Sequence, residues 1–273
     1  MNLPKIKLGK YDVSRVICGG NPITGFSHLN DALDIEMKKY YTVANVHKLL
    51  AECENNGINT VQFRGDRFYL RIMLEHFEAG GKMQWICQTA SEMRDLKANV
   101  REIKAHNPIA IYFHGTEMDN LYHAGKIEQA RDIIKFAKDN GMLVGAGSHM
   151  PEVIEKMEEE RWETDFYMCC LYNLARKPKT EQATKTKNEE ECFEEGDPDI
   201  MTEVIRKVKK PCLAFKIFGA GRKCGTPVVV KERIEYAFKK IKPIDAIVLG
   251  MFQKHKNQIK ENTDFAREIL SGK

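Results

Sequence analysis

The sequence predicts an α/β fold in which eight parallel strands close into a (β/α)8 TIM barrel. Eight short, β-branched apolar runs occur along the 273 residues, and longer amphipathic stretches separate them. The runs are apolar almost throughout instead of alternating with polar residues. Continuously apolar strands that alternate with helices indicate a parallel sheet covered on its outer face. Eight such units are the number that closes into a barrel.

The strands are expected where valine, isoleucine, alanine and phenylalanine cluster. Their predicted ranges are 15–19, 58–63, 83–88, 109–113, 142–146, 165–170, 212–217 and 245–249. Glycines mark the ends of several strands, with Gly80 and Gly81 before the third run and Gly250 after the eighth. Residues 5–14 contain two further short runs around Gly9, which predicts an N-terminal β-hairpin ahead of the barrel.

Helices are expected between the strands. One covers Val43–Asn56, and a second covers Glu92–His106 before a proline that a helix does not continue through. A long helical region ends at Asn140, ahead of the fifth strand. Another helix begins at Pro151, since proline suits the first helical turn, and a last one runs through Leu270.

One stretch interrupts this alternation of strands and helices. Residues 177–198 are polar, with five glutamates between 189 and 195, and are expected to form an acidic insertion after the sixth strand. Two interpretations stay open, a solvated loop and a lid over the barrel mouth, because loops at this end carry the site in such barrels. Residues 1–273 otherwise read as a single barrel domain.

Composition excludes several classes of function. The net charge is only +4 and no basic face stands out, so neither a nucleic-acid nor a membrane partner is expected. No apolar run approaches the roughly 20 residues that span a bilayer, and Met1–Lys10 does not resemble a secretory signal. The eight cysteines form no CxxC pair, which indicates reduced, mostly buried thiols in a cytoplasmic protein. The oligomeric state stays open.

Several strings, in the order in which they occur, resemble segments of the aldo-keto reductase superfamily. They extend over nearly the whole chain, and the resemblance implies the barrel, its hairpin and an ancestral carbonyl-reducing site. The strings are Leu8-Gly9 with Val13-Ser14-Arg15 and Gly19-Gly20, then Gly57-Ile58-Asn59, Ile111-Tyr112-Phe113-His114, Gly145–Glu152, Ala214–Gly221 and Ile259-Lys260-Glu261-Asn262.

The catalytic residues that the resemblance implies are mostly replaced. The family reduces carbonyls with an Asp, a Tyr, a Lys and a His. Here Gln62 stands in place of the Asp, and Arg67 occupies the Tyr position with Tyr69 two residues later. Gln88 ends the third strand where the Lys is expected, and only His114 matches. The usual proton donor, a phenol beside a lysine charge, is therefore missing, with Tyr69 as a candidate replacement.

The resemblance also implies a nicotinamide cofactor site, and part of it is kept. Ser148 aligns with the pair that binds the nicotinamide amide, and Phe215 aligns with the stacking tyrosine. Glu261 and Asn262 match the adenine-side pair. Gln258 replaces the basic residue that reads the 2′-phosphate. NAD(P)H thus stays a candidate cofactor, and the loss of the basic residue argues against recognition of that phosphate.

Polar residues at the carboxyl ends of the strands are the site candidates in any such barrel. Lys216, in an otherwise apolar run, suits a base or a Schiff-base nucleophile, and His114 suits acid–base work. No two histidines have HxH or HxxxH spacing, so no metal is expected. The candidates for binding a small-molecule substrate are Asn21, Gln62, Arg64, Arg67, Gln88, His149 and Asn173.

Three hypotheses about function follow. The first is a divergent aldo-keto-reductase-like enzyme that acts on a small polar, carbonyl- or sugar-like substrate with a non-standard catalytic site. The second is an NAD(P)H-dependent carbonyl reductase with a rearranged site. The third is a non-catalytic barrel that binds a metabolite or a partner, for which the loss of three of the four tetrad residues is the argument.

Overall fold

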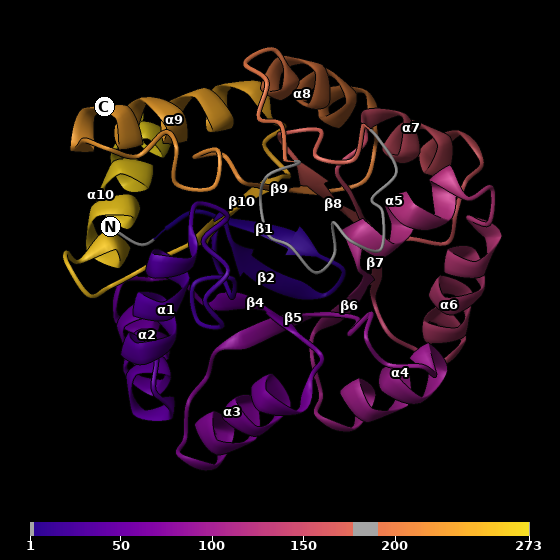
Figure 1. Ribbon diagram of the computed structural model, residues 1–273, viewed down its shortest axis with the longest axis horizontal. Helices are drawn as coiled ribbons and strands as arrows, with labels where there is room; N and C mark the ends of the chain where they lie inside the picture. The colour runs from indigo at the N-terminus through magenta and orange to yellow at the C-terminus, as the bar shows by residue number, and fades with distance from the viewer. Residues whose placement is uncertain (1–2, 177–190, 273) are drawn as a thin grey trace.

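Eight parallel strands close into a barrel, as the sequence predicts. The computed structural model describes residues 3–176 and 191–272. Neighbouring strands pair in chain order, and the eighth pairs with the first. Figure 1 shows the helices as a ring around them. The strands are β3 (Val16–Gly19), β4 (Thr60–Arg64), β5 (Gln84–Gln88), β6 (Ala110–Phe113), β7 (Val144–Ser148), β8 (Phe166–Cys170), β9 (Cys212–Phe215) and β10 (Ala246–Gly250).

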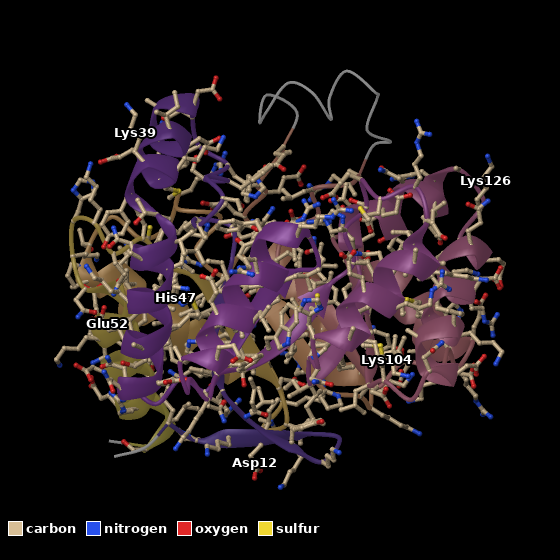
Figure 2. The ribbon with its side chains drawn as sticks, turned by 90° about the horizontal axis from the view of Figure 1, so that it is seen from below. Asp12, Lys39, His47, Glu52, Lys104 and Lys126 are labelled. Carbon is tan, nitrogen blue, oxygen red and sulfur yellow. The ribbon has the colours of Figure 1, made fainter. Side chains whose placement is uncertain are left out.

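The predicted N-terminal hairpin is present and closes one end of the barrel. Strands β1 (Lys5–Leu8) and β2 (Tyr11–Ser14) pair antiparallel around the turn at Gly9. Ile6, Leu8 and Val13 are buried together with side chains from the barrel interior. Figure 2 shows the hairpin, marked by Asp12, at the end of the molecule opposite to Lys39, which lies near the end of the helix α1 (Asp31–Tyr40). This plug leaves the other end of the barrel, where the strands finish, as the open mouth.

Ten helices are assigned in the described part of the chain. The long helical region predicted before Asn140 is two helices, α5 and α6, with a break at 124–127. The helix predicted from Glu92 starts later, at Leu96, because the side chain of Asp95 caps its first turn. The helices are α1 (Asp31–Tyr40), α2 (Val43–Asn55), α3 (Arg67–Glu78), α4 (Leu96–Ala105), α5 (Gly115–His123), α6 (Glu128–Asp139), α7 (Pro151–Glu159), α8 (Asp197–Lys207), α9 (Pro227–Lys240) and α10 (Gln258–Leu270).

Side chains alternate between the barrel interior and the helix-facing layer with the two-residue period of a strand. Ile17, Ile86 and Leu213 belong to the cluster that fills the interior, whereas Val61 and Trp85 belong to the cluster packed against the helices. The same alternation, followed along β4, β5, β6 and β7 to the barrel mouth, directs five polar side chains toward the interior: Gln62, Arg64, Gln88, His114 and His149.

The acidic insertion is only partly described. Residues 177–190 lie outside the described residues, so the choice between a loop and a lid is not decided. The remaining part, from Glu191, leads into α8, whose first two residues, Asp197 and Pro198, were expected in the insertion. No helix in the described ranges is long and apolar enough to cross a membrane.

Candidate functional site

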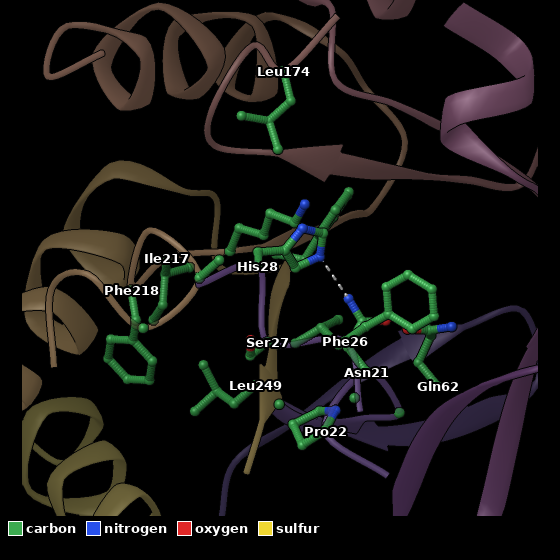
Figure 3. A pocket seen from close by; sticks show the side chains of 18 of the residues that line it. Asn21, Pro22, Phe26, Ser27, His28, Gln62, Leu174, Ile217, Phe218 and Leu249 are labelled. Atoms are coloured by element: carbon green, nitrogen blue, oxygen red, sulfur yellow. Dashed lines mark hydrogen bonds between the residues drawn. The ribbon is translucent and has the colours of Figure 1, made fainter. Parts of the chain in front are cut away.

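A cavity of about 1100 Å³ opens at the carboxyl ends of the strands. Its volume is at the upper end of what small-molecule sites occupy. The wall combines strand ends with the loop after β3, the loop after β9 and the start of α10. Figure 3 shows part of this wall, with Asn21, Gln62, His28 and Phe218 arranged around the open space. The cavity therefore lies where (β/α)8 enzymes carry their chemistry.

Most of the residues proposed from the sequence line this cavity. Tyr69, Arg67 and Ser148 do not: Arg67 is exposed at the first position of α3, and Ser148 is buried behind the wall. Arg67, predicted to bind substrate, is thus not part of the cavity wall, because its side chain is exposed at the start of the helix. The lining candidates are Asn21, Gln62, Arg64, Gln88, His114, His149, Asn173, Phe215, Lys216, Glu261 and Asn262.

His149 is held by a buried carboxylate that sequence reasoning missed. Its Nδ1–H donates to Oδ2 of Asp119 at 2.7 Å. The other oxygen of Asp119 accepts a 2.5 Å hydrogen bond from the hydroxyl of Ser148. Asp119 lies on α5 and is 1% exposed. No sequence pattern links it to His149, thirty positions later; the contact exists because α5 packs against β7.

His114 directly follows β6 and precedes the first residue of α5. Its backbone N–H donates to the hydroxyl of Thr89 at 3.0 Å, and its Nδ1 lies 3.0 Å from the hydroxyl of Ser91. Both hydroxyl residues come from the segment after β5, so neighbouring strand ends hold the ring. The histidine that the resemblance retains is therefore on the cavity wall in an oriented state.

Lys216 follows β9 directly and lines the cavity. The sequence placed it inside the strand, but the strand ends at Phe215, and Lys216 has a φ of 59°. A left-handed backbone is costly for a residue with a Cβ, and such strain is often found at functional sites. Lys216 is half-buried on the cavity wall, directly after the last residue of β9, so it lies outside the apolar strand in which the sequence placed it.

His28, from the loop after β3, is a cavity residue without any sequence signal. Its Nδ1–H donates to a carboxylate oxygen of Glu191 at 2.8 Å, and its Nε2 accepts from the Nδ2 of Asn21 at 3.2 Å (Figure 3). The pKa of His28 is lowered to about 4, chiefly by burial and also by the nearby charge of Lys216, while the contact with Glu191 opposes the shift. The ring is therefore neutral at physiological pH.

Arg64 is a cavity residue whose charge is already partly compensated. One guanidinium nitrogen pairs with Glu92, and Nε lies 3.4 Å from a carboxylate oxygen of Asp66. Asp66 also caps α3 by accepting from the N–H groups of Phe68 and Tyr69. Arg64 thus presents an oriented guanidinium to the cavity, which suits recognition of a polar or anionic group.

Tyr69 is turned away from the cavity. It is 1% exposed, and its hydroxyl donates a 2.7 Å hydrogen bond to the backbone carbonyl of Gly20. Burial raises the pKa of this phenol well above its ordinary value. A phenol with a raised pKa is a weaker proton donor, so the geometry offers no replacement for the family's tyrosine here.

Two glutamines stand where the family's Asp and Lys are expected. Gln88 accepts a 2.6 Å hydrogen bond from the hydroxyl of Tyr112 through its amide oxygen, which leaves the amide N–H groups as donors toward the cavity. Gln62, on the neighbouring strand β4, also lines the wall; in the register it pairs with Ile86, whereas Arg64 pairs with Gln88. Neutral amides at these positions can orient a substrate but do not supply the positive charge with which a lysine lowers the pKa of a phenol.

The cavity continues from the mouth to α10. Phe215, Glu261 and Asn262 all line it. Gln258, in the place of the phosphate-reading basic residue, accepts from the backbone N–H of Phe252 and so stabilises the loop between β10 and α10. Lys256 forms a 2.6 Å ion pair with Glu261 in the same region. Gln258 therefore offers no charge to a 2′-phosphate, and the cation that lines this region, Lys256, is already paired with Glu261.

A metal ion in a protein is held by a cluster of ligating side chains. Within residues 3–176 and 191–272, no three His, Cys, Asp or Glu side chains gather as a metal ion requires. The eight cysteines are all free thiols and six of them are buried.

Comparison with known proteins identifies the fold. No protein-family model and no curated protein sequence matches the chain. The chain is similar to a solved aldo-keto reductase from Bacillus halodurans in its holo form, with a TM-score of 0.60 and 11% identity over 97% of this chain and 90% of that one. It is also similar to a glycerol dehydrogenase from Gluconobacter oxydans, with a TM-score of 0.53 and 11% identity over 98% and 95%.

A protein of different activity matches equally well. A truncated 3-deoxy-D-arabino-heptulosonate 7-phosphate synthase from Thermotoga maritima has a TM-score of 0.57 and 11% identity over 99% of this chain and 92% of that one. At such identities these likenesses show the barrel fold alone, which the resemblance had implied. Function has to be argued from the site.

Proposed function

We propose that this protein is an enzyme with an aldo-keto-reductase-like barrel that acts on a small polar, carbonyl- or sugar-like substrate through a non-standard catalytic site. One observation supports this most: His114, His149 and Lys216 line a single cavity at the barrel mouth, while the hydroxyl of Tyr69 is bonded to Gly20. Groups for acid–base work and for charge stabilisation are thus gathered where the tetrad is incomplete.

The missing phenol is the reason to favour non-reductive chemistry. Hydride transfer to a carbonyl produces an alkoxide that must receive a proton. Tyr69 is a poor donor because it is buried and its pKa is raised. Proton transfer or isomerisation needs a base and an oxyanion stabiliser instead, and an imidazole with a lysine ammonium can supply both.

Each polar group has a role in this proposal. Lys216 stabilises a developing oxyanion or forms a Schiff base, and His114 moves a proton. Arg64, oriented by Glu92, holds a polar end of the substrate. The amides of Gln62 and Gln88 orient hydroxyl groups.

A second candidate function is an NAD(P)H-dependent oxidoreductase with a rearranged site. The extent of the cavity favours it, since one continuous space joins His114 with Phe215 and with Glu261 and Asn262 on α10. Phe215 would stack on the nicotinamide and His114 would be the proton donor. A nicotinamide cofactor would supply hydride when bound.

The first experiment separates the two candidates. The purified protein is titrated with NADH and NADPH while quenching of Trp85 and Trp162 is followed, and calorimetry confirms binding. Saturable micromolar binding supports the oxidoreductase and calls for a screen of aldehydes and ketones. Absence of binding up to about a millimolar, an affinity weaker than ~4 kcal/mol, retires it.

The second experiment tests the favoured function. Candidate carbonyl compounds are added with borohydride, and covalent trapping at Lys216 is located by mass spectrometry, with Lys216→Ala as the control. Substrate turnover or specific trapping supports the enzyme proposal. A barrel that binds neither nucleotide nor any carbonyl compound would instead favour a non-catalytic role.

A further inference from the structure

The contact between Asp119 and His149 fixes both the position and the orientation of the His149 ring. Asp119 is buried on α5 and accepts hydrogen bonds from three donors: the hydroxyl of Ser148 at 2.5 Å, the backbone N–H of His149 at 3.2 Å and the Nδ1–H of His149 at 2.7 Å. A buried carboxylate requires such compensation. Both the main chain and the side chain of His149 are therefore tied to one carboxylate, which locks the orientation of the ring.

This arrangement selects one tautomer of His149. Because Nδ1 donates to Asp119, it carries the proton, and Nε2 of the neutral ring carries the lone pair. The ring meets Phe215 edge-on, with 5.7 Å between the centroids, and it lines the cavity. A substrate in the cavity therefore meets His149 through Nε2 or the ring carbons, since Nδ1 faces the carboxylate.

Lys216 belongs to the same part of the cavity. The ring of His149 contacts Phe215, the residue before Lys216, and both His149 and Lys216 line the cavity together with His28, whose pKa the charge of Lys216 lowers. An oriented imidazole base and an ammonium group on one cavity wall are the two groups that abstraction of a proton next to a carbonyl requires.

We propose that Asp119 is a positioning residue that fixes His149 as the general base of this site, and that the substrate class is an α-hydroxy-aldehyde or α-hydroxy-ketone. This inference rests on the proposed function and names its base and its substrate class. Neither Asp119 nor this role of His149 follows from the resemblance, which aligns His149 next to a cofactor-binding pair.

The step balances without a redox partner. Nε2 of His149 takes the proton from the carbon beside the carbonyl, the C–H electron pair becomes a C=C bond, and the carbonyl π pair moves onto oxygen. The Lys216 ammonium stabilises this enolate oxygen, while Asp119 stabilises the imidazolium. Return of the proton to the same carbon regenerates the substrate. Transfer of the α-hydroxyl proton to the enolate oxygen, followed by delivery of the Nε2 proton to the former carbonyl carbon, forms the new C=O bond and gives the isomer.

The role of Asp119 is tested first by spectroscopy, which needs no substrate. Imidazole ¹⁵N–¹H correlation spectra at pH 7.5 report the tautomer of each histidine, and His149→Gln identifies the resonances of His149. We expect His149 in the Nδ1–H form in the unmodified protein and a shift toward Nε2–H in Asp119→Ala. Glu117→Gln, two positions earlier on α5, is the matched control and is expected to leave the spectrum unchanged. An Nε2–H tautomer in the unmodified protein overturns the proposal.

Proton abstraction is tested by exchange in D₂O. Dihydroxyacetone and glyceraldehyde are incubated with the protein, and NMR follows loss of the proton beside the carbonyl. We expect His149→Gln and Asp119→Ala each to lose at least 100-fold of the exchange rate, with Glu117→Gln unchanged. Circular dichroism verifies that the variants are folded. Asp119→Asn keeps the shape of the side chain but removes its charge, and its amide nitrogen can no longer accept a hydrogen bond, so this variant tests whether shape alone positions His149.

The outcomes distinguish this inference from the proposed function. Exchange that persists in both His149→Gln and Asp119→Ala overturns the assignment of the base but leaves the enzyme proposal standing. Absence of exchange and of binding for every carbonyl probe in the unmodified protein overturns the proposed substrate class, whatever tautomer His149 has.

Discussion

The hydroxyl of Tyr69 donates a 2.7 Å hydrogen bond to the backbone carbonyl of Gly20. This contact joins α3 to the segment after β3 and removes the phenol from the mouth. A Cβ on Gly20 would lie 2.9 Å from the same hydroxyl, so the glycine makes room for it. The tyrosine that the resemblance offered as a replacement proton donor is therefore part of the packing.

The first prediction concerns Tyr69→Phe. Loss of the hydroxyl leaves the buried carbonyl of Gly20 without this donor, which we expect to cost about 1 to 2 kcal/mol of the free energy of unfolding. Urea denaturation measures it. Nucleotide binding and any turnover are expected to change less than twofold. A tenfold loss of turnover without loss of stability would instead make Tyr69 the proton donor of a reductase.

The second prediction concerns the backbone of Lys216, which has a φ of 59°. Lys216→Gly and Lys216→Ala both remove the amine, and both are expected to abolish borohydride trapping and turnover. Only glycine relieves the left-handed strain, so Lys216→Gly is expected to be more stable than Lys216→Ala by about 1 kcal/mol. Thermal denaturation of the two variants side by side provides the measurement. Equal stabilities would show that the turn relaxes in the alanine variant.

The third prediction concerns acid stability and His28. Its pKa is about 4 in the folded protein and 6.5 ordinarily, so between these values the unfolded chain binds more protons than the folded one. Stability is therefore fully present above pH 6.5 and falls as the pH decreases toward 4, by about 2 kcal/mol at pH 5. His28→Asn, which tolerates the φ of 58°, is expected to lose less stability over this range. Urea denaturation midpoints of both proteins at pH 7 and pH 5 test this prediction. Equal losses of stability in the two proteins would contradict the assignment of the acid sensitivity to His28.

The fourth prediction concerns packing inside the barrel at Gly145, on β7. A Cβ there would lie 2.5 Å from ring atoms of Phe166, so Gly145→Ala forces the phenylalanine or the strand to move. We expect a loss of about 1 to 3 kcal/mol. Gly196→Ala, where a Cβ has nothing within 4 Å, is the matched control and is expected to change stability by well under 1 kcal/mol. A similar effect of both substitutions would show that the interior of the barrel is not tightly packed at this level.

The strand positions could be predicted closely because each strand buries both faces. Apolar runs such as 109–113 and 245–249 therefore differ clearly from the amphipathic segments around them. Helix boundaries were less certain, because capping side chains such as Asp95 set them locally and similar polar residues occur in many loops. The break between α5 and α6 lay within one continuous helical pattern and was missed for this reason.

The candidate site was predictable only where it follows the strand register. Parallel strands in a barrel bring their carboxyl ends together, and the two-residue period of a strand decides which side chains face the cavity there. These side chains are Gln62, Gln88, His114 and His149. Asp119 reaches His149 from a helix, and His28 reaches Glu191 from a loop, so no period in the sequence marks either contact.

The sequence by itself determined the barrel and its hairpin, since these depend on apolar periodicity, while the mismatch with the reductive tetrad is what the resemblance implies from residue identity at aligned positions. Only the tertiary structure decided which polar groups act together. It placed the hydroxyl of Tyr69 against Gly20, gave Lys216 its left-handed turn and set Asp119 behind His149. The physical reason is that hydrogen bonds and desolvation depend on distances between segments remote in the chain, and these distances exist only once the helices have packed on the barrel.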